Sequence, residues 1–368
     1  VTVEQARILK KINPKFKLLV CVSSSVCSRS SAALNDTVPS AHYVQIYQNA
    51  ELGPLTHDAT QTIAAHPEWW ARTDTGVPLQ TKQGYELNHS VPEVREWFIG
   101  YSVQVFGGDA KALLDGQFYD GMGYNPDRFA GVSLARHDAW YEGKMRMADE
   151  ARDLYSSLNG GEVWGNGAVG VTGRYHNYTY KGNLVSWHTS MDHLDTGFLE
   201  GAGGYWYENQ TTGEWIPEFF EDFLEGVIAA SSAGKTVVLH FSPGPSFPPI
   251  VHYPQHPDPP FNSFLALDWP GHWNGTTSYG NFSTADDVRQ AAADSLVQTL
   301  APFLIVANEH VFLQYAWFYE MQDGNIPCAA GIECGMPAQW YPEFSKPLGP
   351  PQGRAVKNGP IWTREFAH

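Results

Sequence analysis

The fold is decided by one stretch of the chain, residues 113–122, which read LLDGQFYDGM. Apolar and aromatic residues dominate it, as is typical of a β-strand buried in a parallel sheet, and the run ends at Asp120 followed by Gly121. Glycine lets the backbone turn sharply at this point. Because barrel enzymes carry their catalytic residues where parallel strands end, Asp120 is the first candidate for a catalytic carboxylate.

Strands and helices alternate on both sides of this stretch. We expect strands at residues 16–23, 85–88, 113–122, 162–169, 194–200, 235–241 and 311–318, and helices at 2–12, 92–106, 136–158, 217–233 and 285–304. Such alternation predicts an α/β fold with parallel pairing and right-handed crossovers. In a chain of 368 residues it favours one large (β/α)8 TIM barrel.

The expected strands number seven, one fewer than an eight-stranded barrel needs. Because the chain opens on a helix, the first strand would lie before residue 1 or be supplied by another segment or chain. We expect the barrel to occupy residues 1–336. Residues 337–368, rich in Pro and Gly, are expected to form an extended tail that packs on the barrel or leaves it.

Composition excludes some partners and favours another. The formal net charge is −16, and no cluster of Lys and Arg offsets it locally, so nucleic acid is not an expected partner. The chain has no apolar run of about 18 residues, so no membrane span is expected. Aromatic residues make up 14% of the chain. Since aromatic faces stack on sugar rings, this favours a carbohydrate partner, although large barrels also use many aromatics for packing.

Six Asn-x-Ser/Thr motifs predict an N-glycosylated, secreted, extracellular protein. They begin at Asn35, Asn88, Asn177, Asn209, Asn274 and Asn281. The given sequence starts at Val1, and its first residues contain neither an initiator Met nor a signal peptide. We therefore expect that a targeting segment has been removed or that the sequence starts inside a longer precursor.

The four cysteines fall into two pairs with the same spacing, Cys21 with Cys27 and Cys328 with Cys334. In an oxidising compartment this predicts two local disulfides. The spacing is too wide for the short knuckles of a four-cysteine zinc site. Cys21 lies in an apolar run, so a buried free thiol is the alternative there.

A second carboxylate ends another expected strand. Glu200 closes residues 194–200 and is followed by glycine, as Asp120 is. Two carboxylates across a barrel mouth can hydrolyse a glycosidic bond, one attacking or activating water and the other protonating the leaving oxygen. The alternative is that one or both bind a backbone amide or an ion at the rim. Candidate substrate-binding residues are Asn166 and His240 after other strands, Tyr119 beside Asp120, and Trp164 and Trp206 as platforms for a sugar ring.

Other chemistries find little support. The chain has no Gly-x-Ser-x-Gly elbow, phosphate-binding loop or His-Glu-x-x-His helix. His252, His256 and Asp258 could bind a metal, but the prolines around them favour a merely rigid loop. A polysaccharide lyase would want basic residues for uronates, which are scarce. No metal or other cofactor is expected.

Three groups of motifs resemble a family of glycoside-hydrolase-type TIM-barrel proteins that is distantly α-galactosidase-like. They are HPEWW at 66–70 with DTGVP at 74–78, then Asn88 with PEVREW at 92–97 and the two Asp-Gly pairs at 115 and 120, and finally WYPEF at 340–344, PLGPP at 347–351 and TREF at 363–366. They are short and spread over most of the chain. Members are assigned as hydrolases largely by fold, so the resemblance supports architecture more than activity.

The resemblance implies that residues 16–23 form the second barrel strand. Asp120 then ends strand four and Glu200 strand six. Retaining α-galactosidase-like barrels carry the nucleophile and the acid on those strands, which implies nucleophile for Asp120 and acid for Glu200. Such relatives often have Asp at strand six, so Glu200 departs from their pattern.

Two functions from different classes fit this sequence. One is a secreted glycoside hydrolase that acts on an extracellular polysaccharide or glycan. The other is a catalytically silent barrel glycoprotein with a structural, filament-forming or carbohydrate-binding role, which the acidic surface and the missing strand suit. For this second function we would expect the protein to self-assemble, or another chain or segment to complete the barrel. An open pocket between Asp120 and Glu200 would favour the enzyme.

Overall fold

The computed structural model describes two compact units, residues 1–197 and 198–368. Within them the described residues are 3–23, 26–29, 39–41, 62, 65–81, 84–105, 112–124, 129–158, 160–168, 178–199, 202, 217–241, 285–315, 327–328, 332–333 and 341–368. No described helix is long and apolar enough to cross a membrane.

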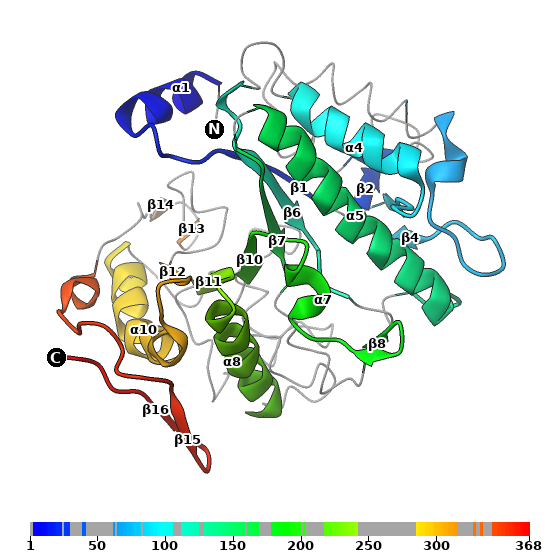
Figure 1. Ribbon diagram of the computed structural model, residues 1–368. Coiled ribbons are helices and arrows are strands. Elements are labelled where there is room, and N and C mark those ends of the chain that lie inside the picture. Colours follow the sequence, from blue (N-terminus) through cyan, green and yellow to red (C-terminus); the bar gives the residue numbers. More distant parts are fainter. Residues whose placement is uncertain are drawn as a thin grey trace. The chain divides into compact units, whose positions relative to one another are not determined.

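The first unit is built on three parallel strands, β1 (Leu19–Ser23), β6 (Gly116–Asp120) and β7 (Glu162–Asn166). β6 pairs with both of the others. Two helices, α4 (Pro92–Val105) and α5 (Leu134–Leu158), lie side by side in this unit (Figure 1). Contacts of α5 with β6 and β7, and of α4 with β1, bury the core of the unit.

Gly116 allows β6 and β7 to approach closely. A Cβ at this position would lie 1.7 Å from the backbone oxygen of Glu162 on β7. No side chain can be accommodated at that distance without separating the strands. The glycine of the Asp115-Gly116 pair is therefore needed where β6 begins, at the end of the strand opposite Asp120.

A small antiparallel sheet also belongs to the first unit. Its strand order is β3-β2-β5-β4, with β2 at Val26–Arg29, β3 at Pro39–Ala41, β4 at Gln80–Thr81 and β5 at Gly84–Glu86. The prediction of a barrel strand at residues 85–88 is wrong, because β5 pairs antiparallel with β2 and β4. Tyr85 and Glu86 make their ladder contacts there, and Leu87 forms an isolated bridge to Trp70.

The remaining elements of the first unit are short or terminal. They are α1 (Val3–Ile12), the 3-10 helix η1 (Pro67–Trp69), the β8–β9 hairpin (Thr179–Tyr180 and Asn183–Leu184) and α7 (His188–Met191). Strand β10 (Thr196–Leu199) contains the boundary between the units, and all four of its residues are buried.

The second unit pairs β11 (Thr236–Phe241) in parallel with β12 (Val311–Tyr315). Helices α8 (Pro217–Ser232) and α10 (Ala285–Val306) pack on each other and on these strands. After α8 the chain reverses at Gly234, whose φ is +83°. The N–H of Lys235 donates to the oxygen of Ala230, a bond that closes the end of the helix before β11 begins.

The expected C-terminal tail is folded where the structure describes it. It contains the 3-10 helix η7 (Pro342–Ser345) and an antiparallel hairpin of β15 (Val356–Asn358) and β16 (Ile361–Thr363). Before it, β13 (Pro327–Cys328) pairs with β14 (Ile332–Glu333). The guanidinium of Arg364 donates 2.7 Å to the oxygen of Ile305, which ties the tail to α10.

All predicted helices and six of the seven predicted strands are confirmed within a few residues of their expected bounds. An α/β fold with parallel strands is therefore correct. The described strands form open ladders rather than a closed sheet, so barrel closure stays a prediction.

Candidate active site

Asp120 and Asn166 form a polar pair at the carboxyl ends of two neighbouring strands. Asp120 is the last residue of β6, and Asn166 is the last residue of β7. The side-chain amide of Asn166 donates a hydrogen bond of 2.8 Å to Oδ1 of Asp120. Asn166 is buried, whereas Asp120 is partly exposed. The amide therefore orients a carboxylate that solvent reaches.

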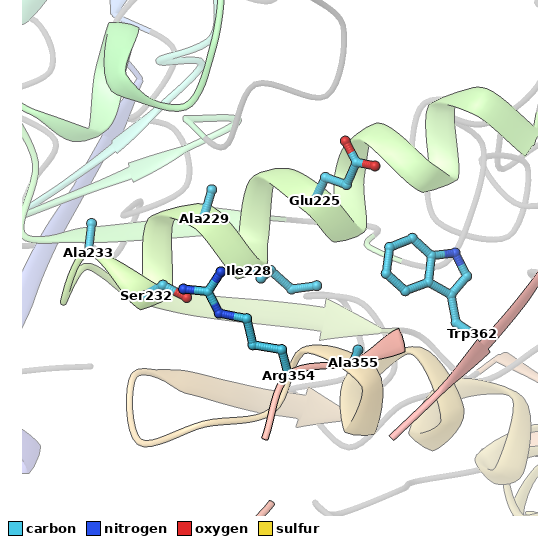
Figure 2. A pocket seen from close by; sticks show the side chains of 8 residues that line it. All are labelled: Glu225, Ile228, Ala229, Ser232, Ala233, Arg354, Ala355 and Trp362. Atoms are coloured by element: carbon cyan, nitrogen blue, oxygen red, sulfur yellow. The ribbon is translucent and has the colours of Figure 1, made fainter. Parts of the chain in front are cut away.

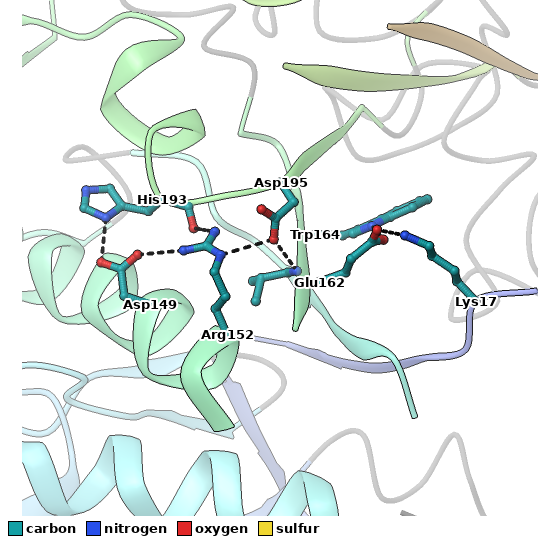
Figure 3. Close-up of polar contacts among 8 residues, drawn as sticks. Lys17, Asp149, Arg152, Glu162, Trp164, His193 and Asp195 are labelled. Atoms are coloured by element: carbon teal, nitrogen blue, oxygen red, sulfur yellow. Dashed lines mark hydrogen bonds and ion pairs between the residues drawn. The ribbon is translucent and has the colours of Figure 1, made fainter. Parts of the chain in front are cut away.

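Trp164 lies on the same face of β7 as Asn166, because side chains alternate along a strand. Its indole N–H donates 3.1 Å to Oε2 of Glu162, and Glu162 also pairs with Lys17 (Figure 3). The polar atom of the ring is thus directed toward the amino end of the strand. At the Asp120 end, Trp164 can offer a ligand only the apolar surface of its ring.

The turn after β6 is fixed from two sides. Gly121 has a φ of +74°, which favours glycine, and confirms the sharp turn expected after Asp120. The ammonium of Lys144, on α5, donates 3.1 Å to the oxygen of Gly121. The N–H of Met122 donates 2.8 Å to the oxygen of Asn166. These bonds hold the backbone beside Asp120 and bring a cation to the turn.

Three tyrosines gather behind this turn. Tyr124 follows it, Tyr141 is on α5 and Tyr180 is on β8; their ring centroids are 5.1–5.7 Å apart in edge-to-face contacts. The hydroxyl of Tyr124 donates 2.7 Å to Asp138. Burial raises the pKa of Tyr124 and Tyr141 well above the ordinary tyrosine value, so both hydroxyls stay neutral. Through Ser190, which contacts both Tyr141 and the oxygen of Met122, the cluster is connected to the turn after β6.

The β8–β9 hairpin is anchored to α5 through its turn. Lys181 and Gly182 have φ angles of 50° and 79°, as a tight two-residue hairpin turn requires. The N–H of Lys181 donates 3.1 Å to Asp138, and its ammonium lies 2.8 Å from Glu142. Hydrogen bonds from Lys181 and then Arg146 lower the pKa of Glu142, and the bond to Glu142 raises the pKa of Lys181.

Lys144 and the tyrosine cluster were not predicted from the sequence. The helical spacing of α5 could have indicated that Tyr141 is buried, since it lies four residues after another buried residue, His137. Nothing in the sequence indicated which strand end either Tyr141 or Lys144 would meet. The contacts depend on the tertiary packing of α5.

Tyr119, predicted to bind substrate, lies on the other face of β6. Its side chain is fully buried and packs toward α4, with its ring centroid 6.4 Å from that of Phe98. Desolvation raises the pKa of its hydroxyl well above the ordinary value. Neighbours in a strand point to opposite faces, so the residue before Asp120 belongs to the strand–helix core rather than to the strand end.

Asp115 lies at the amino end of β6, where its contacts are structural. Its Oδ2 accepts a hydrogen bond of 2.5 Å from the ammonium of Lys10 and one of 2.7 Å from the N–H of Leu18. Its backbone oxygen accepts 3.0 Å from the N–H of Glu162. One residue thereby joins α1, the start of β1, β6 and β7.

Asp195 has a similar structural role before β10. Its Oδ2 accepts a hydrogen bond of 2.8 Å from the N–H of Val163 and one of 3.3 Å from the guanidinium of Arg152 (Figure 3). Arg152 also donates 3.1 Å to Asp149, which lies 2.8 Å from Nδ1 of His193. The network ties α5 to the amino ends of the strands, opposite the Asp120 end.

Other predicted site residues lie elsewhere or outside the described residues. His240 is in the second unit, buried near the end of β11, with its ring 6.0 Å from that of Phe198. Glu200 and Trp206 lie outside the described residues. The possible metal ligands His252, His256 and Asp258 do as well.

The predicted covalent modifications stay predictions. Of the six glycosylation motifs only Asn88 is described; it is partly exposed, and its Oδ1 accepts 3.1 Å from the N–H of Ser90, within the same motif. The backbones of Cys21, Cys27 and Cys328 lie in β1, β2 and β13, and Cys334 is outside the described residues.

Comparisons with known proteins found two solved structures of interest. The glycoside hydrolase domain of PelA from Pseudomonas aeruginosa is 11% identical, covering 67% of this chain and 74% of that chain, with a TM-score of 0.40. A structure from work on two fungal β-1,4-galactanases is 13% identical, covering 65% of this chain and 62% of that chain, with a TM-score of 0.34. No family model and no curated protein matches. At these TM-scores the function has to be inferred from this chain's own residues.

Proposed function

We propose that this protein is a glycoside hydrolase in which Asp120 is one of two catalytic carboxylates. The observation that carries the proposal is the partly exposed Asp120 at the end of β6, oriented by the amide of Asn166. An N–H donor suits an ionised carboxylate, the form that a nucleophile or a general base needs.

Support comes from how firmly this one carboxylate is positioned. The turn after it is held by Lys144 and by the backbone of β7, and the tyrosine cluster stands behind that turn. Catalysis by a carboxylate depends on such fixed geometry, because a displacement of about 1 Å can cost about 100-fold in rate. Asp115 and Asp195, in contrast, are held by structural bonds at the opposite strand ends.

The second carboxylate in this proposal is Glu200, acting as the acid. A nucleophilic Asp120 would form a glycosyl-enzyme intermediate and retain the anomeric configuration. If Asp120 instead activates water, the configuration is inverted. The configuration of the first product, followed by proton NMR, decides between these roles.

The experiment is a screen of neutral polysaccharides and chromogenic glycosides with the wild type, Asp120→Asn and Asp153→Asn. Asp153 is an exposed residue of α5 and makes the same chemical change away from the strand ends. We expect Asp120→Asn to lose at least about 1,000-fold in kcat, since it removes a group that reacts in the transition state, while Asp153→Asn keeps full activity.

Turnover that Asp120→Asn leaves unchanged would sink the assignment of Asp120. If no glycoside is cleaved, yet a glycan is bound, the silent carbohydrate-binding barrel takes the place of the enzyme.

A further inference from the structure

A groove opens in the second unit between α8 and the C-terminal hairpin. Its volume is about 510 Å³, and it is a shallow hollow open to solvent rather than an enclosed cavity. In Figure 2, Arg354 extends along α8 near Ser232, while Glu225 and Trp362 lie toward the other end. None of these side chains belongs to the strand ends where Asp120 lies.

The hairpin that carries Trp362 is fastened to α8. The ammonium of Lys357 lies 2.5 Å from Glu221 on α8 and 5.8 Å from the ring centroid of Trp362. One cation thus connects the helix to the aromatic ring. The indole N–H of Trp362 is buried, so the ring contributes its apolar surface to the groove. The ring is a platform held in place before any ligand arrives.

The polar groups of the groove balance in charge. Glu225 supplies one carboxylate and Arg354 one guanidinium, and the other polar side chain in the lining is the hydroxyl of Ser232. Because these two charges are opposite, the lining has no net charge that would favour an anion or a cation. A ligand with many hydroxyls can hydrogen-bond to both groups, because carboxylates accept and guanidinium groups donate hydrogen bonds.

Small residues on α8 leave room for a ring-shaped ligand. Ala229 and Ala233 are exposed and line the groove with Ser232, so this part of the helix surface has little side-chain bulk. A flat, partly apolar ring with hydroxyls at its edge matches an aromatic platform, small wall residues and a pair of opposite charges.

We propose that this groove is a binding site for a neutral saccharide, with Trp362 as the stacking platform and with Glu225 and Arg354 as hydrogen-bonding partners of its hydroxyls. The site lies entirely in the second unit and holds the polymer without cleaving it. It does not depend on catalysis at Asp120.

The test is affinity electrophoresis in gels that contain soluble galactan, mannan, xyloglucan or β-1,3-glucan, with polygalacturonate as the acidic comparison. Every protein also carries Asp120→Asn. This substitution prevents cleavage of the polymer at the strand ends, so that retardation reports binding alone. We expect retardation by at least one neutral polymer, weakened about tenfold or more by Trp362→Ala. Trp362→Phe keeps a ring and should retain binding within about threefold.

A second variant tests the groove without altering the hairpin. Ala229→Gln places a longer side chain in the groove and should also weaken binding about tenfold, while Ala139→Gln, at an exposed position of α5, should not. Circular dichroism melts check that each variant is folded.

Three results overturn the proposal. They are no retardation by any neutral polymer, retardation by polygalacturonate alone, and neutral-polymer binding that survives both Trp362→Ala and Ala229→Gln. Hydrolysis that Asp120→Asn leaves unchanged, with binding at the groove intact, would contradict only the proposed function, so the two failures are distinguishable.

Discussion

The bond between Asn166 and Asp120 joins two strands through their last side chains. Its length of 2.8 Å and the burial of Asn166 leave the amide little freedom to move away. For a glycosidase we propose that this is an orienting contact, in which Asn166 positions Asp120 rather than contacting the substrate.

Removing this contact should lower kcat more than it changes KM. We expect Asn166→Ala to lose about 10- to 100-fold in kcat on a glycoside that the wild type cleaves, because Asp120 then samples unproductive orientations. Asn166→Asp should lose more, since it lacks the N–H donor and places a second carboxylate beside Asp120. Steady-state kinetics measures both. A rise in KM alone, with kcat constant, would mean that Asn166 contacts the substrate instead.

At the scale of the element, α5 shows how a glycine can be required inside a helix. Glycine normally weakens a helix interior by about 1 kcal/mol relative to alanine. A Cβ on Gly143, however, would lie 2.2 Å from the backbone oxygen of His89, whereas one on Gly100 in α4 would meet nothing within 4 Å. Helix propensity and packing therefore act in opposite directions at Gly143.

The two glycines should respond to alanine with opposite signs. We expect Gly100→Ala to stabilise the protein by about 0.5–1 kcal/mol. Gly143→Ala should destabilise it by about 1–3 kcal/mol, because backbone cannot yield as a flexible side chain does. Urea unfolding measures both free energies. Equal stabilisation by the two substitutions would show that α5 can shift away from His89 without cost.

The anchored β8–β9 hairpin should depend on pH. The pKa of Glu142 is lowered, so its contribution is present above its ordinary value of 4.5 and is lost as pH falls through the lowered value. The pKa of Lys181 is raised, so its contribution is present below 10.5 and is lost as pH rises through the raised value. The anchor is therefore strongest between those limits.

Hydrogen exchange of the hairpin, corrected for intrinsic rates, should report this window. Protection of the Lys181 amide, which donates to Asp138, should fall when pH drops from 7 to 3. Glu142→Gln should weaken protection of the Lys181 amide at pH 7. It should also make this protection less dependent on pH. Glu93→Gln, at an exposed position of α4, serves as the control. Protection that is the same for wild type and Glu142→Gln at pH 7 would contradict an anchoring role for this pair.

The sequence predicted elements better than contacts. The apolar run before Asp120 and the glycine after it located both the end of β6 and the turn. The strand predicted at residues 85–88 was wrongly assigned to the barrel, because a stretch of only four residues does not reveal its pairing partner, and β5 pairs antiparallel with β2. Tyr119 was grouped with its neighbour Asp120 although period-two alternation sends it to the opposite face. The roles of Lys144 and Tyr180 arise only when α5 and the hairpin pack together.

At the scale of the whole molecule, 39 acidic residues outnumber 23 basic ones, and six glycosylation motifs are spread along the chain. We propose that the protein is secreted and N-glycosylated. Produced in a eukaryotic secretory host, it should migrate as a heavier species that collapses toward the polypeptide mass of 40.9 kDa after treatment with peptide-N-glycosidase F. Mass spectrometry would identify the occupied sites. An unchanged intact mass after the treatment would contradict the proposal.

The carboxylate of Asp115 contacts parts of the chain that are synthesised well before it. It binds the N–H of Leu18, 97 residues earlier, and the ammonium of Lys10, 105 residues earlier. At a translation rate of roughly 5–20 residues per second, Leu18 leaves the ribosome about 5–20 s before Asp115 does. Throughout that interval β1 lacks its neighbour β6, so its backbone is open to pairing with another nascent chain. We therefore expect β1 to be most open to such mispairing during those seconds, and faster synthesis of residues 19–115 to shorten the exposure.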